Sequence, residues 1–303
     1  MSLHVIVGAG PIGSTTASLL ADRGERVRVV TRSGGGPEHP NVERVAADAT
    51  DADRLASLTE GAVALYNCAS PAYHRWLTDW PPIASALLTA AERTGAVLAT
   101  TSNLYGYGEV NGPITPSTPL SATHPKLRLR ADMWRAARDA HDAGRIRATE
   151  VRGSDYLEAN SIFAVALGKP LLAEKKAWSP APLDVPHSWT SITDVAALLT
   201  TAATDERAWG KAWLVPSEPP LTIRQLATRF TAVARVAAPK LGTIPTPLMR
   251  VVGLFSPMVK ELRTTEYQFA RPFVLDSSLT TETFGLKPRA IDDSLRAAVA
   301  ALR

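Results

Sequence analysis

Three glycines near the amino terminus have the spacing of a loop that binds phosphate groups. Gly8, Gly10 and Gly13 follow an apolar run directly and lie at the start of a helical pattern. In such a loop the first glycine permits a tight turn, the second lets backbone N–H groups approach a diphosphate, and the third lets the helix pack on the sheet. Pro11 suits the first helical turn, where its missing N–H is not needed. The motif predicts a dinucleotide site, with a ligand-free structural turn as the alternative.

A basic side chain follows the second apolar run, where NAD-binding chains commonly carry an acid. The segment is Thr31-Arg32-Ser33, followed by three glycines. A guanidinium can bind a phosphate through two hydrogen bonds, whereas a carboxylate would repel it. Thr31 and Ser33 could add hydroxyl donors. We therefore predict NADP as the cofactor; a solvated surface arginine is the alternative interpretation.

Several other chemistries lack their residues in this sequence. The six histidines, at positions 4, 39, 74, 124, 141 and 187, do not form an HExxH motif or another paired spacing of metal ligands, so we predict no metal. There is no G-x-S-x-G nucleophile motif and no Walker A loop. Cys68 is the one cysteine, which excludes an internal disulfide and a CxxC site. We interpret it as a small buried hydrophobic residue.

The composition is that of an ordinary globular protein. Of 303 residues, 45% are hydrophobic and 20% are charged. The 33 basic and 29 acidic residues are interspersed without an aromatic–basic platform, so we expect no nucleic-acid partner, and the excess positive charge suits a phosphorylated cofactor. No apolar run approaches the ~18 residues of a membrane helix, and no signal peptide precedes the first strand. We therefore expect a cytoplasmic protein without a membrane partner.

Short β-rich runs alternate with helical patterns in the first half of the chain. We expect strands at Leu3–Val7, Val27–Val30, Val42–Ala46, Val63–Asn67, Val97–Thr100 and Ala148–Arg152. Between them lie helical patterns at Ile12–Arg23, Asp53–Glu60, Trp80–Arg93 and Leu127–Ala143. This alternation predicts an α/β fold of the Rossmann type, with a doubly wound parallel sheet. Because ligands bind at the carboxyl ends of such strands, functional residues should follow the strands.

The second half of the chain is rich in proline, since 17 of the 23 prolines follow residue 110. We interpret their clusters as loops, at Gly112–Pro119, Trp178–Pro186, Pro216–Pro220 and Pro239–Pro247. Helices are expected at Ile192–Thr204 and Thr222–Ala238. We predict an NADP-binding Rossmann domain over residues 1–152, to which 187–212 return. Residues 153–186 and 213–303 would form a smaller, loop-rich substrate-binding region.

With these features the chain resembles the extended short-chain dehydrogenase/reductases, above all their atypical, epimerase-like members. The matching segments are Ala47–Thr50, Cys68–Ser70, Thr100–Gly106, Arg152–Tyr156, His187–Asp194 and the tail from Glu261 to Phe284. The resemblance implies that Asp48 contacts the adenine and that the segment around Cys68 lines the cofactor. The expected cofactor-binding residues are Gly8, Gly10, Pro11, Ile12, Gly13, Thr31, Arg32, Ser33, Asp48, Ala49, Cys68, Ala69, Ser70 and Thr100.

The same resemblance implies that Thr101 hydrogen-bonds a substrate carbonyl or alcohol oxygen. The family's catalytic Tyr-x-x-x-Lys is replaced here by Lys126 and Arg130, which is similar to a K-x-x-x-R variant among atypical members. Residues four apart share one helix face, so Lys126 could carry a proton while Arg130 binds the ribose or a phosphate. The alternative is a solvated basic face, because this helix carries three further arginines.

Two tyrosines lie in the glycine-flanked turn after Thr101. Tyr105 or Tyr107 could offer a phenol to a substrate, and packing under the loop is the alternative. Ser102 and Asn103 replace the acidic pair of the sugar-nucleotide dehydratases, which disfavours a 4,6-dehydratase. His74 and His187 could face the substrate, and four tryptophans could form an apolar wall for it. We interpret these residues as structural instead, with the tryptophans as core anchors: His74, Trp76, Trp80, Trp178, His187 and Trp189.

Together these features predict an NADP(H)-dependent oxidoreductase or epimerase-like enzyme that acts on a small-molecule carbonyl or alcohol. Two alternatives stay open. One is an NADP-binding sensor or scaffold without turnover, and the other is a non-redox isomerase or cyclase on the same fold. The resemblance also implies a homodimer formed through the helices at Trp80–Arg93 and Leu127–Ala143.

Overall fold

The chain folds into two compact units in the computed structural model, which describes residues 1–158, 161, 163–245 and 263–303. Unit 1 comprises Met1–Gly108, Leu120–Arg152 and Val195–Trp213, and unit 2 comprises Glu109–Pro119, Gly153–Asp194 and Leu214–Arg303. Two sequence predictions extend beyond the described residues. The end of the loop Pro239–Pro247 and the first two residues of the tail Glu261–Phe284 lie outside them.

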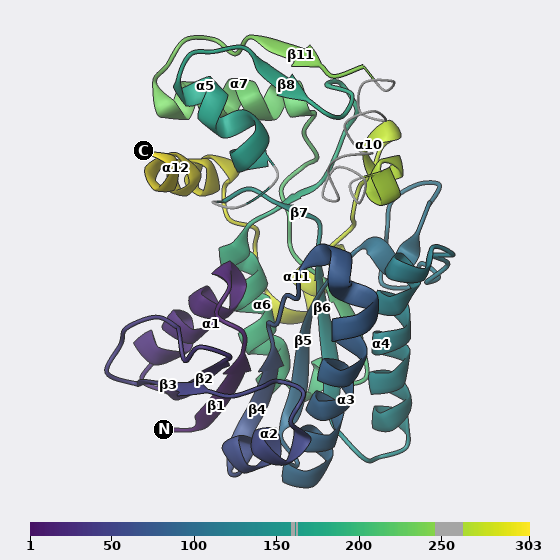
Figure 1. Ribbon diagram of the computed structural model, residues 1–303. Helices are drawn as coiled ribbons and strands as arrows, with labels where there is room; N and C mark the ends of the chain where they lie inside the picture. The colour runs from purple at the N-terminus through teal and green to yellow at the C-terminus, as the bar shows by residue number, and fades with distance from the viewer. Residues whose placement is uncertain (159–160, 162, 246–262) are drawn as a thin grey trace. The chain divides into compact units, whose positions relative to one another are not determined.

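A seven-stranded sheet forms the centre of unit 1 (Figure 1). Its strands are β1 (Leu3–Val7), β2 (Arg26–Thr31), β3 (Val42–Ala46), β4 (Ala62–Asn67), β5 (Val97–Asn103), β6 (Ala148–Gly153) and β10 (Ala212–Leu214). Their order is β10-β6-β5-β4-β1-β2-β3. β1 pairs in parallel with β2 and β4, and β2–β3 and β4–β5 are parallel as well. The Rossmann-type fold is confirmed, and its strand order reverses between β1 and β4, where such folds bind ligands.

Helices cover this sheet on both faces (Figure 1). They are α1 (Pro11–Asp22), α2 (Ala52–Thr59), α3 (Trp76–Thr94), α4 (Pro125–Asp142) and α6 (Ile192–Thr204). Apolar side chains of α2, α3 and α4 form one core with β1, β4 and β5, in which Leu55, Leu87 and Trp134 are buried. Arg23 follows α1, and its guanidinium donates to the Thr200 hydroxyl of α6 at 3.5 Å. The predicted strands and helices of this unit are confirmed to within a few residues.

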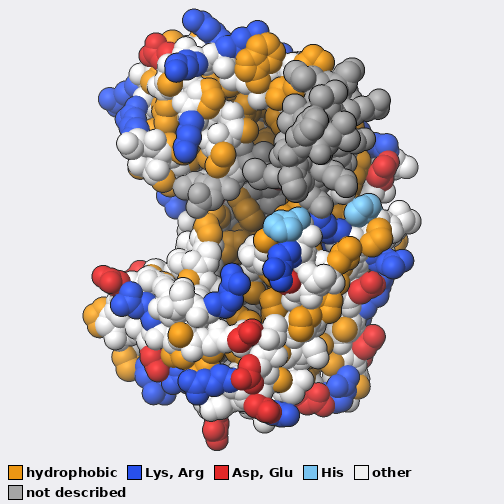
Figure 2. Space-filling model, in the orientation of Figure 1, with side chains coloured by type: hydrophobic (Ala, Val, Ile, Leu, Met, Phe, Trp, Pro, Cys, Tyr) orange, Lys and Arg blue, Asp and Glu red, His pale blue; other side chains and the backbone are white. Residues whose placement is uncertain are grey.

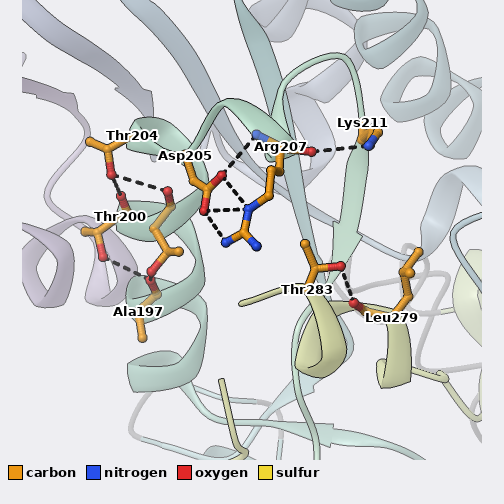
Figure 3. A network of polar contacts seen from close by, with 9 residues as sticks. Ala197, Thr200, Thr204, Asp205, Arg207, Lys211, Leu279 and Thr283 are labelled. Carbon is orange, nitrogen blue, oxygen red and sulfur yellow. Dashed lines mark hydrogen bonds and ion pairs between the residues drawn. The ribbon is translucent and has the colours of Figure 1, made fainter. Parts of the chain in front are cut away.

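A polar turn ends α6 and leads to β10 (Figure 3). The Asp205 carboxylate accepts the backbone N–H of Arg207 at 3.0 Å and pairs with its guanidinium at 2.7 Å. The Lys211 ammonium donates to the Arg207 carbonyl at 3.2 Å. Because Asp205 satisfies an N–H that a continuing helix would bond to its own backbone, the chain turns here. β10 can then pair with β6 at the edge of the sheet.

Unit 2 is built on helices and two pairs of short strands. Its elements are β7 (Asp155–Tyr156), the π-helix η3 (Ala164–Gly168), α5 (Lys169–Leu172), β8 (Ala177–Ser179), β9 (Trp189–Thr190), α7 (Ile223–Ala234), β11 (Leu241–Thr243), α10 (Tyr267–Ala270), α11 (Ser278–Phe284) and α12 (Ile291–Leu302). α7 begins with a capping box between Thr222 and Gln225. Phe230 of α7 and Leu295 of α12 are buried in the same core.

Two segments that proline content predicted to be loops contain strands. β8 lies at the start of Trp178–Pro186, and β11 lies within Pro239–Pro247; the two pair in parallel. The prediction was wrong because a three-residue strand has no periodicity, and its partner lies far away in the sequence. The helix predicted to reach Ala238 ends at Ala234, because Arg235 adopts a left-handed conformation with φ +56°.

Acidic and basic side chains are interspersed over the part of the surface that unit 1 presents in Figure 2. Many of them are paired across neighbouring elements, for example Arg145 with Glu92 and Arg28 with Glu43. No helix among the described residues combines the length and the apolar character needed to cross a membrane.

A buried histidine in β1 makes the stability of unit 1 depend on pH. His4 Nδ1 lies 3.0 Å from the Tyr66 hydroxyl, and burial lowers the pKa of His4 from its ordinary 6.5, although Glu25 acts in the opposite direction. Below pH 6.5 the unfolded chain therefore binds a proton that the folded chain resists, and stability falls as the pH falls. We expect thermal melts from pH 5 to 8 to show a shallower acid-side decline for His4→Asn. An unchanged slope would remove His4 as the cause.

Candidate functional site

The turn after β1 brings three backbone segments into direct contact. Gly8 has φ +103°, and a Cβ at this position would lie 2.4 Å from the Cys68 carbonyl oxygen. A Cβ on Gly13 would lie 2.0 Å from the Gly8 carbonyl oxygen. Both distances are shorter than any real contact, so only glycine allows β1, the start of α1 and the end of β4 to approach this closely.

Gly10 differs from Gly8 and Gly13, because a side chain at its position would point into open space. Among the residues that the structure describes, no heavy atom lies within 4 Å of the position that a Cβ of Gly10 would take. Gly10 is the N-cap of α1 without a capping side chain, and Pro11 begins the helix. The N–H groups of Ile12 and Gly13 belong to the first turn, where the helix dipole favours an anion. The open space and the donors fit a diphosphate.

The end of β2 presents Arg32 and Ser33 to solvent. Thr31 is half-buried, and its hydroxyl donates to the Gly35 carbonyl at 3.0 Å, inside the loop. Of the two hydroxyl donors expected beside Arg32, Ser33 is therefore the exposed one. Gly34 has φ +70°, which gives this loop its tight bend.

Charged residues that follow β2 and β3 interact with one another. Asp48 accepts the N–H and the hydroxyl of Thr50, both at 2.9 Å. These bonds lower the pKa of Asp48, and the positive charge of Arg32 lowers it further. Arg32 also contributes to the low pKa of Asp79 in α3, whose main cause is Arg75. The residues predicted to hold the adenosine end of a dinucleotide therefore lie at one edge of the sheet.

The turn after β4 lies beside the glycine turn. Cys68 is buried, and burial raises the pKa of its thiol to about 12, so the thiol stays protonated. Its Sγ lies 3.6 Å from the Thr101 hydroxyl. Ala69 is half-buried and Ser70 is exposed. Cys68 therefore acts as a buried packing residue, as predicted, and it joins the ends of β4 and β5.

The basic residues of α4 lie on two different faces. Lys126 and Arg130 are buried, with 3% and 4% of their surfaces exposed. The other three arginines are exposed and paired with acids on the same helix, as in Arg128–Asp132, Arg135–Asp132 and Arg138–Asp142. The alternative of one solvated basic face is therefore wrong for Lys126 and Arg130. Burying two cations is costly, so their environment must compensate.

Arg130 joins α4 to the end of β5. One of its terminal nitrogens donates to the Thr101 carbonyl at 2.8 Å and to the Ser102 hydroxyl at 3.1 Å. Its guanidinium lies over the rings of Trp80 and Trp76, 4.7 and 5.7 Å from their centroids. Arg130 therefore fixes the backbone of Thr101. Its contact with a ribose or phosphate stays a prediction.

The Lys126 ammonium lies over an aromatic ring that sequence reasoning missed. Its Nζ is 4.5 Å from the centroid of Tyr73, in the 3-10 turn η1 (Tyr73–Arg75) that precedes α3. Tyr105 is half-buried, and its ring contacts those of Tyr73 and Trp76, with centroids 6.3 and 5.9 Å apart. No spacing in the sequence relates these rings to α4, because they come from two successive crossovers, one from β4 to β5 and one from β5 to β6.

Tyr107, the second tyrosine of the turn, points into the protein. It is fully buried, and its hydroxyl accepts a hydrogen bond from Arg152 at 2.7 Å. Arg152 in turn pairs with Glu150 at 2.6 Å. Burial raises the pKa of Tyr107, although Arg152 acts in the opposite direction. For Tyr107 the packing interpretation is confirmed, and the buried ion pair fixes the turn η2 (Tyr105–Tyr107).

The two histidines interpreted as structural lie in different environments, since His74 of unit 1 is exposed and His187 of unit 2 is buried. His187 is buried and stacks on Phe269, with its Nε2 2.8 Å from the Asp155 carboxylate. The Ser154 hydroxyl lies 3.4 Å from that same nitrogen, so the three residues do not form a serine–histidine–acid relay. Trp76, Trp80 and Trp189 are buried as expected.

The interpretation of the four tryptophans as core anchors is wrong for Trp178. It is 50% exposed, and the Lys176 ammonium lies 4.2 Å above its ring. The reason is its position in β8, where side chains alternate between the two faces and its neighbours Ala177 and Ser179 are the buried ones.

Comparison with known proteins identifies the family. The sequence model of the NAD dependent epimerase/dehydratase family matches residues 4–211, which is more than half of the chain. The chain therefore belongs to the NAD dependent epimerase/dehydratase family, and the resemblance to extended short-chain dehydrogenase/reductases is confirmed. No curated protein sequence matches the chain.

Solved structures of this type share the fold over almost the whole chain. dTDP-glucose 4,6-dehydratase from Bacillus anthracis, in complex with NAD, has a TM-score of 0.80 at 13% identity, covering 99% of this chain and 96% of that one. UDP-glucuronic acid 4-epimerase from Bacillus cereus, also with NAD, has 0.79 at 15%, covering 99% and 98%. UDP-glucose 4-epimerase from Thermotoga maritima, with UDP-glucose, has 0.78 at 14%, covering 99% and 98%. At these identities the likeness shows the fold alone.

The two kinds of glycine in the first turn should respond differently to a methyl group. Gly8→Ala places Cβ against the Cys68 carbonyl at a positive φ, so we expect the melting temperature to fall by ~10 °C. Gly10→Ala should melt like the wild type, because its methyl enters open space, but should bind dinucleotide ~10-fold more weakly. Calorimetry and nicotinamide fluorescence titration check the pair. Wild-type affinity in Gly10→Ala would show that the ligand lies elsewhere.

Proposed function

We propose that this protein is an NADP(H)-dependent oxidoreductase or epimerase-like enzyme that acts on a small-molecule carbonyl or alcohol. The observation that carries the proposal is the burial of Lys126 and Arg130 beside the end of β5, where Thr101 lies. Lysine and arginine side chains are rarely this buried, and the carboxyl ends of the strands are where folds of this type bind their ligands. Membership of the family supports a nicotinamide dinucleotide as the cofactor.

Arg32 supports a preference for the phosphorylated dinucleotide. Its guanidinium is exposed at the end of β2, next to the exposed Ser33, where the ribose of the adenosine half would lie. The carboxylate of Asp48 accepts two hydrogen bonds within its own turn, and Arg32 adds positive charge nearby. An added phosphate would therefore meet a cation that can bind it through two hydrogen bonds.

Chemistry at the other end of the site would use side chains of β5 and α4. When bound, the nicotinamide supplies hydride transfer. The Thr101 hydroxyl would hydrogen-bond the substrate oxygen and polarise its carbonyl. Lys126 would exchange a proton with that oxygen, in the place where relatives carry a tyrosine. Arg130 would act through Thr101 by holding its carbonyl, and Tyr105 would line the substrate space.

A second candidate function follows from Lys126 itself. A lysine at the tyrosine position changes the proton-transfer group without changing the glycine turn, so the protein could bind NADP as a sensor or scaffold without turnover. A non-redox isomerase or cyclase would use the same pocket with a structural dinucleotide. Binding of the dinucleotide is common to all three, whereas consumption of NADPH belongs to the first alone.

The preference for NADPH can be measured by titration with both reduced dinucleotides. We expect NADPH to bind more tightly than NADH. Arg32→Ala should weaken the affinity for NADPH ~30-fold and leave the affinity for NADH unchanged, because one charged pair to the phosphate is lost. Arg26→Ala is the matched control, since Arg26 is an exposed arginine at the opposite end of β2. Equal loss for both dinucleotides in Arg32→Ala would argue against a phosphate contact.

Turnover can be tested by NADPH oxidation against a panel of small carbonyl compounds. We expect Thr101→Val and Lys126→Ala each to lower kcat/KM ~100-fold, because each removes a group from the reacting oxygen. Arg128→Ala controls for the helix, since Arg128 lies on its exposed face. If both variants keep wild-type turnover, the assignment of Thr101 and Lys126 is wrong. NADPH binding without turnover of any compound would favour the sensor.

We also propose that two copies of the protein form a homodimer through α3 and α4. The exposed face of α4 carries ion pairs, so a dimer there would be joined by polar contacts in addition to the partly buried Leu129 and Met133. Light scattering of the purified protein, with and without 1 M salt, tests for such a dimer.

A further inference from the structure

Aromatic side chains of η1 and of the first turns of α3 lie against both buried cations of α4. Tyr73 faces Lys126 at 4.5 Å, and Trp80 and Trp76 face Arg130 at 4.7 and 5.7 Å. Lys126 and Arg130 are one helical turn apart, and their aromatic partners follow one another along η1 and the first turns of α3. One continuous aromatic surface thus supports the whole pair.

The ring of Tyr73 is held from two sides. It packs edge-on against Trp76 at 4.6 Å and against Tyr105 at 6.3 Å. Trp76 is itself fixed, because its indole N–H donates to the Pro71 carbonyl at 3.1 Å. The turn around Tyr73 is closed by the Arg75 N–H, which donates to the Ala72 carbonyl at 2.7 Å. Tyr73 is therefore a constrained ring, and it can restrict where the lysine side chain lies.

We propose that Tyr73 is a positioning residue, whose ring holds the Lys126 ammonium at the carboxyl end of β5. A cation over a ring face is attracted by the quadrupole of the ring, and the attraction grows when water is excluded, as it is for a lysine that is 3% exposed. The lysine side chain has four rotatable bonds, and the face of the ring favours the rotamers that place its nitrogen at this point. The inference rests on the proposed function, because it assigns the ring a part in proton transfer by Lys126.

The position of the lysine can be measured without any turnover. With ¹³Cε-labelled lysine, the Lys126 methylene signal should be shifted upfield by the ring current of Tyr73, and Lys126→Arg assigns it by its loss. We expect Tyr73→Phe to keep the shift and Tyr73→Leu to abolish it. Lys176, which lies 4.2 Å above Trp178, is an internal reference that should not change. A Lys126 signal that is the same in Tyr73→Leu as in the wild type would overturn the inference.

Kinetics then separate positioning from a purely structural role. Tyr73→Leu should lower kcat ~10-fold with KM for NADPH unchanged, while Tyr73→Phe retains most of the activity. In a Lys126→Ala background, Tyr73→Leu should cause no further loss, because the ring acts only through the lysine. The inference would be overturned if Tyr73→Leu lowered kcat equally in both backgrounds, or if Tyr73→Phe lowered kcat as much as Tyr73→Leu.

The two proposals fail in different ways. If the wild type turns over no carbonyl compound, the proposed function fails, and the role of the ring in proton transfer is overturned with it, whatever the lysine spectra show. If the wild type is active and Tyr73→Leu changes neither kcat nor the Lys126 signal, the positioning role fails alone. A melting temperature for each variant identifies loss of activity through unfolding.

Discussion

The contact between the backbone of Gly8 and the backbone of Cys68 is the constraint on which the site depends. At this point the turn after β1 and the turn after β4 touch without a side chain between them, and Gly13 brings the start of α1 against the same turn. Strands β1 and β4 are the parallel pair at which the order of the strands in the sheet reverses. The close approach therefore places the amino end of α1 directly over the switch point and leaves the space beside Gly10 open.

The second half of the site depends on how two buried cations are compensated. A lysine and an arginine inside a protein need partners that replace water. Arg130 finds them in the Thr101 carbonyl, the Ser102 hydroxyl and the Trp80 ring, and Lys126 finds one in the Tyr73 ring. These partners come from the carboxyl end of β5, from η1 and from the first turns of α3. The contacts that compensate the two charges are thus also the contacts that hold the residues of the candidate site together.

Membership of the family goes together with low sequence identity to solved structures that share its fold. Dehydratases and epimerases with 13–15% identity share the fold over 96–98% of their lengths, so the fold tolerates almost complete replacement of the sequence. Lys126, the proton-transfer group that we propose, is buried on α4. A fold that is held by backbone contacts and an apolar core leaves the reacting group free to differ.

The sequence by itself determined the elements of unit 1 and the chemistry of the glycine turn. Apolar runs that alternate with helical patterns have only a few ways to bury their surfaces, and a positive φ against a carbonyl admits only glycine. Tertiary structure alone decided which basic side chains of α4 are buried, because the periodicity of a helix marks only its apolar side chains as core. It also decided that Tyr73 meets Lys126, that Tyr107 turns inward, and that β8 pairs with β11. These contacts join residues far apart in the chain, and their free energy comes from partners that no local pattern encodes.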